Sequence, residues 1–290
     1  MNAEVATALW HSIECRLHTA DPGWRDKIIH FGQVAAVEAR GKGRRWTDAE
    51  VFEGLVRSVL SNSVDWEKVE RVLPQLVERL HGFDPRWYAS LSPAYVLEDL
   101  EPWFKGQKAG STVLRRGLER MIQAARRLLA ESERHGSMHD YFNSLFEQEG
   151  HDPKRMVIAL GSGSYTRPHR LPGLGIPLAA EFLRNIGFDI SKPDRHINRA
   201  CGCFGLVQFS RWPDCAGTTP PMATEAELRA VMQAMEDGAQ LVEGSGLPVA
   251  FLDNAVWLLC AKSGAKKGLY LSNQQLEDMR CKIDEKRVSS

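Results

Sequence analysis

The sequence predicts an all-α fold. Apolar residues recur at helical spacing along most of the 290 residues, whereas the alternating pattern of a half-buried strand is almost absent. Hydrophobic residues make up 43% of the chain and charged residues 26%, which is typical of a globular protein. The chain is therefore long and apolar enough for a large helical core, built as one domain or two lobes.

The helices can be placed in order along the chain. Thr47 and Glu50 have the spacing of a capping box, and apolar residues follow at helical spacing as far as Leu60. A second helix is expected over 69–80, ending near Gly82, and a long one over 111–130. Further helices are expected at 138–147, 177–186, 195–204, 224–242, 249–262 and 273–284. Turn residues gather at 40–45, 161–175 and 210–222, which we expect to be loops.

Composition excludes several classes of protein. No apolar run approaches the roughly 18 residues that a membrane span needs. The first residues, MNAEVATALWHSIEC, contain an acid and a histidine where a secretory signal has a basic start and an apolar stretch. We therefore expect a cytoplasmic protein without membrane association.

Charge is balanced overall but not locally. The 37 basic and 37 acidic residues cancel. Between Lys105 and Arg127, however, Glu119 is the single acid among seven basic residues, and 154–199 contains eight basic residues against three acids. Two basic stretches on a neutral chain favour a localised anion-binding site over a general affinity for polyanions.

The six cysteines, at 15, 201, 203, 215, 260 and 281, predict reduced thiols. They contain neither a C-x2-C pair nor the four-cysteine run of an iron–sulfur cluster. We expect buried apolar thiols and no metal. The alternative is a zinc site assembled from distant residues such as His11, Cys15, Cys201 and Cys203.

The first informative motif is LPGLG at 171–175, which precedes an apolar segment of helical length. Gly173 and Gly175 allow close approach of another chain, and the amides that open the helix would converge on one point. Such a turn binds phosphate because unpaired amides and the helix dipole both favour an anion. The alternative is an ordinary Pro-Gly turn before a helix.

The second motif is KPDRHINR at 192–199, where Asp194 follows a proline and opens an apolar-faced helix. Asp194 has the position of an N-cap, which aspartate often occupies. A carboxylate fixed there could also stabilise an oxocarbenium-like sugar, or orient and deprotonate a water. The two interpretations are compatible.

Together the two motifs resemble the signature of the HhH-GPD base-excision DNA glycosylases, an L-P-G-h-G hairpin followed by D-x-H-x-x-R. Leu171, Gly173 and Gly175 match the hairpin, and the second motif is matched by Asp194, His196 and Arg199. The segment 52–63 is similar to the helix that opens the family's helical barrel. Between Val51 and Phe146, FEGLV, Trp66, HGFDP and HGSMHDYFNSLF resemble the 3-methyladenine DNA glycosylase I group.

The chain also departs from these relatives. Ser58 stands where that group has a glutamate, and its zinc ligands are not evident. Members with lyase activity have a lysine after the hairpin that forms a Schiff base, whereas this chain has Pro177. The four-cysteine cluster of the endonuclease III branch is absent from the sequence. The resemblance therefore implies a monofunctional enzyme without a cofactor.

The resemblance implies a role for each matched residue. Asp194 is expected to be catalytic. The residues expected to contact DNA are Leu171, Gly173, Gly175, Lys192 and Arg199, with Asn62 or Ser63 filling the space of an extruded base. Trp66 and Trp46 are candidates for the base pocket, where an aromatic face would favour a cationic alkylated purine. The alternative for both tryptophans is a place in the core.

The expected architecture has two helical lobes with a cleft between them. Residues 46–187 would form a barrel ending in the helix-hairpin-helix, and 1–45 with 188–290 a second lobe that carries Asp194. The expected function is a monomeric glycosylase that releases a damaged base, such as 3-methyladenine, from double-stranded DNA. The alternatives are a non-catalytic helix-hairpin-helix protein that binds DNA or senses damage, and an enzyme that binds a phosphorylated small molecule.

Overall fold

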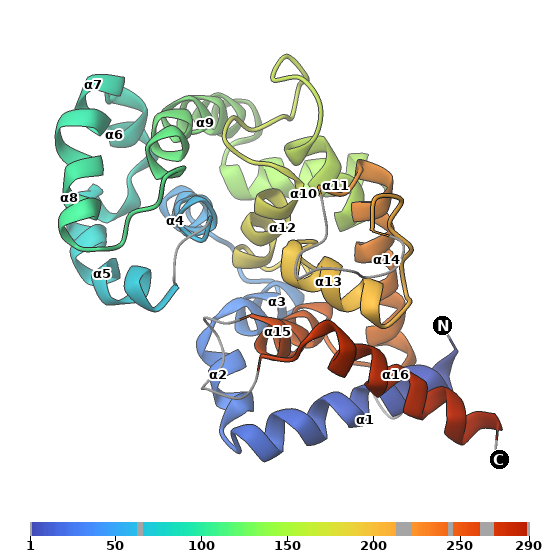
Figure 1. Cartoon of the computed structure of the whole chain (residues 1–290). Helices are drawn as coiled ribbons and strands as arrows, with labels where there is room; N and C mark the ends of the chain where they lie inside the picture. Colours follow the sequence, from blue (N-terminus) through green and yellow to red (C-terminus); the bar gives the residue numbers. More distant parts are fainter. Residues whose placement is uncertain (1, 63–65, 213–221, 243–245, 262–269, 289–290) are drawn as a thin grey trace. The chain divides into compact units, whose positions relative to one another are not determined.

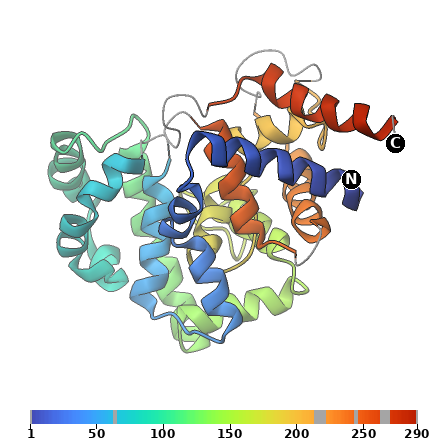
Figure 2. The same cartoon turned by 90° about the horizontal axis from the view of Figure 1, so that it is seen from below.

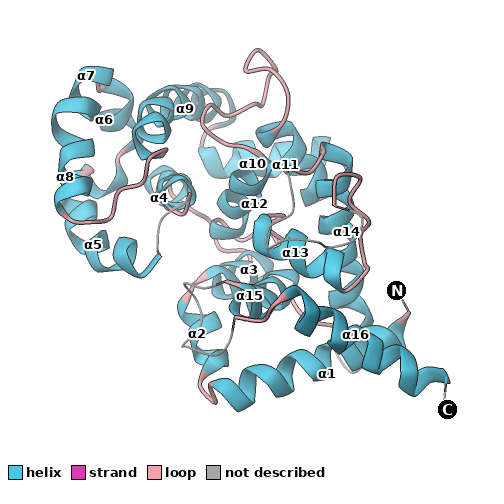
Figure 3. Ribbon diagram, viewed as in Figure 1, coloured by secondary structure: helices cyan, strands magenta, loops and turns pink. Residues whose placement is uncertain are grey.

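The computed structural model describes residues 2–62, 66–212, 222–242, 246–261 and 270–288, without the side chains of Trp66 and residues 282–288. In these ranges all regular secondary structure is helical and there is no strand, which confirms the all-α prediction (Figure 3). None of the helices in these ranges combines the length and the hydrophobicity needed to cross a lipid bilayer.

The chain divides into two compact units. The terminal unit comprises Met1–Glu38 and Asp189–Ser290, and the central unit comprises Ala39–Phe188. The first boundary falls within α3 (Gln33–Gly41), so residues 39–45, expected with the chain ends, belong to the central unit. Arg40 explains this difference, because its guanidinium donates to the carbonyl of Ile186 at 2.9 Å and stacks on Phe188 at 3.9 Å.

The central unit is built around α9 (Leu114–His135) and α12 (Ile176–Asn185). Helix α9 packs against α4 (Asp48–Leu60), α6 (Pro85–Ser90) and α10 (Met138–Gln148), and α12 packs against α4 and α11 (Pro153–Gly161) (Figure 1). The remaining elements are α5 (Trp66–Arg79), η1 (His81–Phe83), α7 (Pro93–Tyr95), η2 (Val96–Leu100) and α8 (Glu101–Gly106). The capping box is confirmed, because the Glu50 amide donates to Thr47 Oγ1 and the Thr47 amide donates to Glu50 Oε2.

Backbone contact between α11 and α12 depends on Gly161. A Cβ atom at this position would lie 2.8 Å from the Cα atom of Ile176, closer than real Cβ atoms come. The neighbour is backbone and cannot turn aside, so only glycine allows the end of α11 to lie directly against the start of α12. This contact fixes the hairpin that connects the two helices.

The terminal unit consists of α1 (Ala3–Ala20), α2 (Trp24–His30), α13 (Arg195–Cys203), α14 (Glu225–Leu241), α15 (Val249–Cys260) and α16 (Asn273–Val288). Helices α1 and α16 lie side by side, although they come from opposite ends of the chain (Figures 1 and 2). Helix α15 is apolar on nearly all sides and is buried. The rings of Trp10 and Trp24 contact Phe251 of α15, with centroids 6.0 and 5.8 Å away.

Candidate functional site

The predicted hairpin forms in the central unit. Gly173 has φ +90°, and a Cβ atom there would lie 3.1 Å from Cβ of Arg120 on α9, so both conformation and space favour glycine. Leu171 and Leu174 are buried on either side of Gly173. The Leu171 amide donates to the carbonyl of Leu160 at 3.1 Å, which ties the turn to α11. Leu171 therefore anchors the hairpin by its side chain, and this side chain is not available to DNA.

Two hairpin amides are free to bind a ligand. Neither Gly173 nor Gly175 donates its N–H to any other residue that the structure describes. Gly175 is exposed and is the N-cap of α12, where no side chain caps the helix. Free amides at the positive end of a helix dipole favour an anion. Pro177 occupies the first turn of α12, where a missing N–H costs nothing.

Asp194 is the N-cap of α13 in the terminal unit. Its Oδ1 accepts from the amides of His196 at 2.8 Å and Ile197 at 3.2 Å. Its Oδ2 has no hydrogen-bond partner among the residues that the structure describes, and the side chain is half-buried. One carboxylate oxygen is thus held by the helix, and the other is available to a ligand.

The segment leading to Asp194 is clamped to α15 by two carboxylates. Asp189 accepts from the amides of Val249 and Ala250, at 3.0 and 2.8 Å. Asp253 is 1% exposed, and its Oδ1 accepts from the Ser191 hydroxyl at 2.6 Å and the Lys192 amide at 2.8 Å. The pattern of the sequence does not reveal Asp253, because it lies in an apolar helix and its partners are distant in the chain. Lys192 is half-buried.

One turn after Asp194, the amide side chain of Asn198 is 7% exposed. Its Oδ1 is buried and has no hydrogen-bond partner in the described part of the chain. A buried carbonyl oxygen of this kind is costly unless a donor satisfies it, so such atoms often mark a place where water or a ligand binds. Asn198 therefore adds a hydrogen-bond acceptor to the start of α13.

The expectation that Arg199 contacts DNA requires correction. Its side chain is 2% exposed and donates to the carbonyls of Leu271 and Cys260, at 2.8 and 3.0 Å, and to Asn273 Oδ1 at 3.0 Å. The guanidinium also lies 4.8 Å from the Tyr270 ring centroid. Every strong interaction of Arg199 is thus internal, and the residue ties α13 to the end of α15 and the start of α16.

The side chain of His196 packs against neighbouring side chains of the protein. Its ring packs edge-on against Trp257, with centroids 6.3 Å apart, and Arg195 Nε donates to its Nε2 at 3.2 Å. Burial lowers the pKa of His196 below its ordinary value. The side chain is therefore mainly neutral at neutral pH.

Trp46 does not form an open base pocket. It is 6% exposed, stacks on His139 at an interplanar angle of 14°, and lies under the guanidinium groups of Arg40 and Arg44 at 5.0 and 5.1 Å. Burial lowers the pKa of Arg40 to about 10. The indole is thus buried among neighbours within the protein, and the core interpretation holds for this residue.

The predicted space-filling loop follows α4. Asn62 is exposed, and its carbonyl accepts from the Ser111 hydroxyl at 3.3 Å, close to the start of α9. Ser63 lies outside the described residues, as does the side chain of Trp66, whose backbone begins α5. Ser58, at the position of the family glutamate, is fully buried and donates to the carbonyl of Leu178 at 2.5 Å. It joins α4 to α12 instead of facing a ligand.

The arginines of α9 have several roles. Arg115 pairs with Glu119 at 3.1 Å, and Arg126 donates to the carbonyl of Ala89 at 2.8 Å. Arg116 and Arg120 form no ion pair with any carboxylate that the structure describes. These two unpaired cations leave α9 positively charged beside Gly173.

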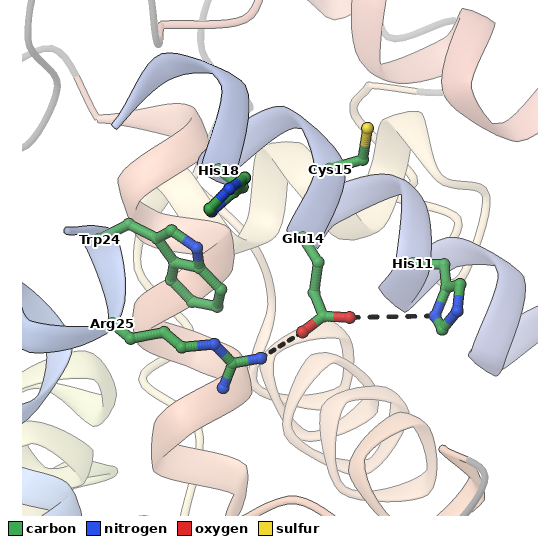
Figure 4. Close-up of a pocket in the computed structure, with 6 residues that line it drawn as sticks. All are labelled: His11, Glu14, Cys15, His18, Trp24 and Arg25. Atoms are coloured by element: carbon green, nitrogen blue, oxygen red, sulfur yellow. Dashed lines mark hydrogen bonds and ion pairs between the residues drawn. The ribbon is translucent and has the colours of Figure 1, made fainter. Parts of the chain in front are cut away.

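A shallow pocket lies in the terminal unit, on α1 and the start of α2 (Figure 4). Glu14 binds the guanidinium of Arg25 and lies 3.8 Å from Nδ1 of His11, and Cys15, His18 and Trp24 complete the lining. Across the described ranges, no three histidine, cysteine or carboxylate side chains are grouped so that they could hold a metal ion. Cys201, Cys203 and Cys260 are buried, and burial raises the pKa of Cys260 to about 12. These three cysteines fit the prediction of buried apolar thiols, whereas Cys15 and Cys281 are exposed and do not.

The hairpin and Asp194 belong to different units, the central and the terminal one. Comparisons of the chain with protein-family models, with curated proteins and with solved structures gave no match. The function is therefore inferred from the motifs and the geometry described above.

Proposed function

We propose that the chain is a monofunctional DNA glycosylase that hydrolyses the N-glycosidic bond of a damaged base in duplex DNA and leaves an abasic site. The observation that carries this proposal is the state of Asp194. One oxygen is fixed by two backbone amides, and the other is free. The hairpin supports the same function, because the free amides of Gly173 and Gly175 suit a backbone phosphate.

The chemistry requires the damaged nucleotide to leave the duplex, since stacking shields its glycosidic bond. As that bond breaks, positive charge develops at C1′ of the sugar. The free oxygen of Asp194 stabilises this charge, which lowers the energy of the transition state more than that of the substrate, whose sugar carries no charge. The electron pair of the glycosidic bond neutralises the cationic alkylated purine, which leaves as the neutral base. Water adds its hydroxyl to C1′, and its remaining proton passes to solvent.

Asn198 can orient that water. Its buried Oδ1 lacks a donor and lies one helical turn beyond Asp194, so a water between the two side chains would have two acceptors. Such a water presents a lone pair to the sugar. No Schiff base is proposed, because Pro177 has no amine. An alkylated purine such as 3-methyladenine is the proposed substrate class, on the basis of the family resemblance.

A non-catalytic helix-hairpin-helix protein that binds DNA is the second candidate. Two observations favour it: capping of α13 alone accounts for the position of Asp194, and Trp46 offers no open face to a base. This candidate predicts that duplex DNA is bound and not modified.

A strand-nicking assay after alkali treatment separates the two candidates. Duplexes containing an N3- or N7-alkylated purine, hypoxanthine, 8-oxoguanine or uracil are compared, with wild-type protein and Asp194→Asn. Nicking of one lesion by the wild type, lost in Asp194→Asn, supports the glycosylase and identifies its substrate. If none of the duplexes is nicked while salt-sensitive binding is intact, the binding protein is correct.

A further inference from the structure

The loop between α11 and α12, residues 162–170, is anchored to helices on both sides. From α9, Arg127 donates to the carbonyls of Tyr165 at 3.1 Å and Arg167 at 3.3 Å, and also to that of Arg170. Arg170 is buried and donates to the carbonyls of Leu160 and Leu171, at 2.8 and 2.7 Å. The loop is therefore a fixed surface that ends at the hairpin (Figure 1).

This fixed loop exposes an aromatic ring. Tyr165 is 42% exposed, although its backbone is held by Arg127. The guanidinium groups of Arg120 and Arg170 lie 5.4 and 4.9 Å from the centroid of the ring. An exposed aromatic ring that is already positioned loses little conformational entropy when it binds a planar partner. The ring therefore presents a stacking platform.

The surroundings of Tyr165 are strongly cationic. Residues 153–180 contain no acidic side chain. Arg116, Arg120 and Arg127 lie within about 40° of one another around α9, since a helix has 3.6 residues per turn. Arg116, Arg120 and Arg167 form no ion pair with a described carboxylate. Unpaired cations beside an exposed aromatic ring are complementary to the phosphates and bases of a nucleic-acid strand.

We propose that the 162–170 loop is a second DNA contact, in which Tyr165 stacks on a base of the strand whose phosphate the hairpin holds. The hairpin is next to this surface, because Gly173 packs directly on Arg120. On binding, Arg120 turns from the tyrosine ring to a phosphate, and the ring face that it leaves receives the base. The inference rests on the proposed function for the identity of the ligand, but it needs no catalysis.

The test is equilibrium binding of two fluorescein-labelled duplexes, one intact and one with a tetrahydrofuran abasic analogue, over a range of salt concentrations. Tyr165→Ala is expected to raise the Kd for the abasic-analogue duplex about tenfold, and Tyr165→Phe to leave it close to that of the wild type. Arg120→Gln is expected to reduce the salt dependence by about one phosphate contact. Leu97→Ala is the matched control, because Leu97 is 41% exposed in the same unit, and its Kd should not change.

The proposal is overturned if Tyr165→Ala leaves the Kd for both duplexes unchanged. It is also overturned if Leu97→Ala loses as much affinity as Tyr165→Ala. Thermal melting of each variant checks that the substitution leaves the fold intact. All measurements are repeated on Asp194→Asn. If Tyr165→Ala loses binding while no lesion is nicked, the DNA contact stands and the glycosylase proposal fails. If a lesion is nicked equally by wild type and Tyr165→Ala at limiting DNA concentration, the glycosylase stands and the Tyr165 contact fails.

Discussion

The carboxylate of Asp253 accepts a hydrogen bond from the backbone amide of Lys192 at 2.8 Å, two residues before Asp194. The same Asp253 oxygen accepts from the Ser191 hydroxyl at 2.6 Å. A buried carboxylate is stable only when hydrogen bonds replace its hydration, so the 189–194 segment cannot move away from α15 without a large cost. The position of Asp194 therefore depends on a side chain that is buried in α15.

Replacement of Asp253 tests this dependence. Asp253→Ala removes the acceptor and is expected to lower the single-turnover rate of base release about tenfold, with the Kd for duplex DNA unchanged. The free energy of unfolding should fall by about 2 kcal/mol, because two donors lose a charged partner. Asp253→Asn retains an oxygen acceptor and should recover most of the rate. Equal rates for Asp253→Ala and the wild type would show that the clamp does not position Asp194.

The hairpin glycines provide a matched pair of variants. Gly173→Ala forces a side chain into φ +90° and against Arg120, and should destabilise the protein by about 1–2 kcal/mol. Gly175 has φ −94°, and its nearest neighbour would lie 3.9 Å away, so Gly175→Ala should have nearly the stability of the wild type. Urea unfolding measures both. Similar losses in the two variants would mean that the hairpin conformation is not the cause.

Arg199 is expected to affect stability and not DNA binding. Arg199→Lys cannot reproduce the three hydrogen bonds of the guanidinium and should lower the free energy of unfolding by about 2 kcal/mol. The salt dependence of duplex binding, measured at a temperature where the variant is folded, should equal that of the wild type. If the slope of the logarithm of the binding constant against the logarithm of the salt concentration falls by about one phosphate contact, Arg199 does bind a phosphate.

Stability is expected to fall as the pH decreases through about 6.5. Burial lowers the pKa of both His139 and His196 below the ordinary 6.5, so the unfolded chain binds protons that the folded chain resists. The loss begins near pH 6.5 and is complete below the folded pKa values. Urea unfolding on either side of this pH measures it, and His139→Gln with His196→Gln should remove most of the dependence. Backbone hydrogen bonds from Thr224 and Ser210 lower the pKa of Glu227 to about 2. Its protonation therefore affects stability only at a much lower pH.

The helices and their caps could be predicted because they depend on local sequence. Thr47 and Glu50 form the expected capping box, and Asp194 caps α13. The helix expected at 111–130 spans Leu114–His135 instead, because it continues as far as the left-handed C-cap Gly136. The LPGLG turn likewise lies directly before a helix, α12, as the motif predicts.

The partners of the candidate site could not be predicted, because they depend on contacts between distant parts of the chain. Arg199 matches a motif in the sequence, yet Cys260 and Leu271 enclose its side chain. Asp253 is hidden in the apolar helix α15, and Tyr165 is one residue of a loop rich in turn-forming residues. A motif indicates which residue types are present, whereas burial and hydrogen bonding decide which of them remain available.

The order of synthesis determines when the parts of the terminal unit can pack together. The central unit, Ala39–Phe188, emerges from the ribosome as one continuous stretch, whereas α1 and α2 must wait for α15 before Trp10 and Trp24 can bury their rings against Phe251. Asp194 also precedes α15, so the clamp between its segment and Asp253 closes only after α15 has been synthesised. A nascent chain thus possesses its hairpin before its clamped carboxylate segment. On the proposed function, it would bind DNA before it could release a base.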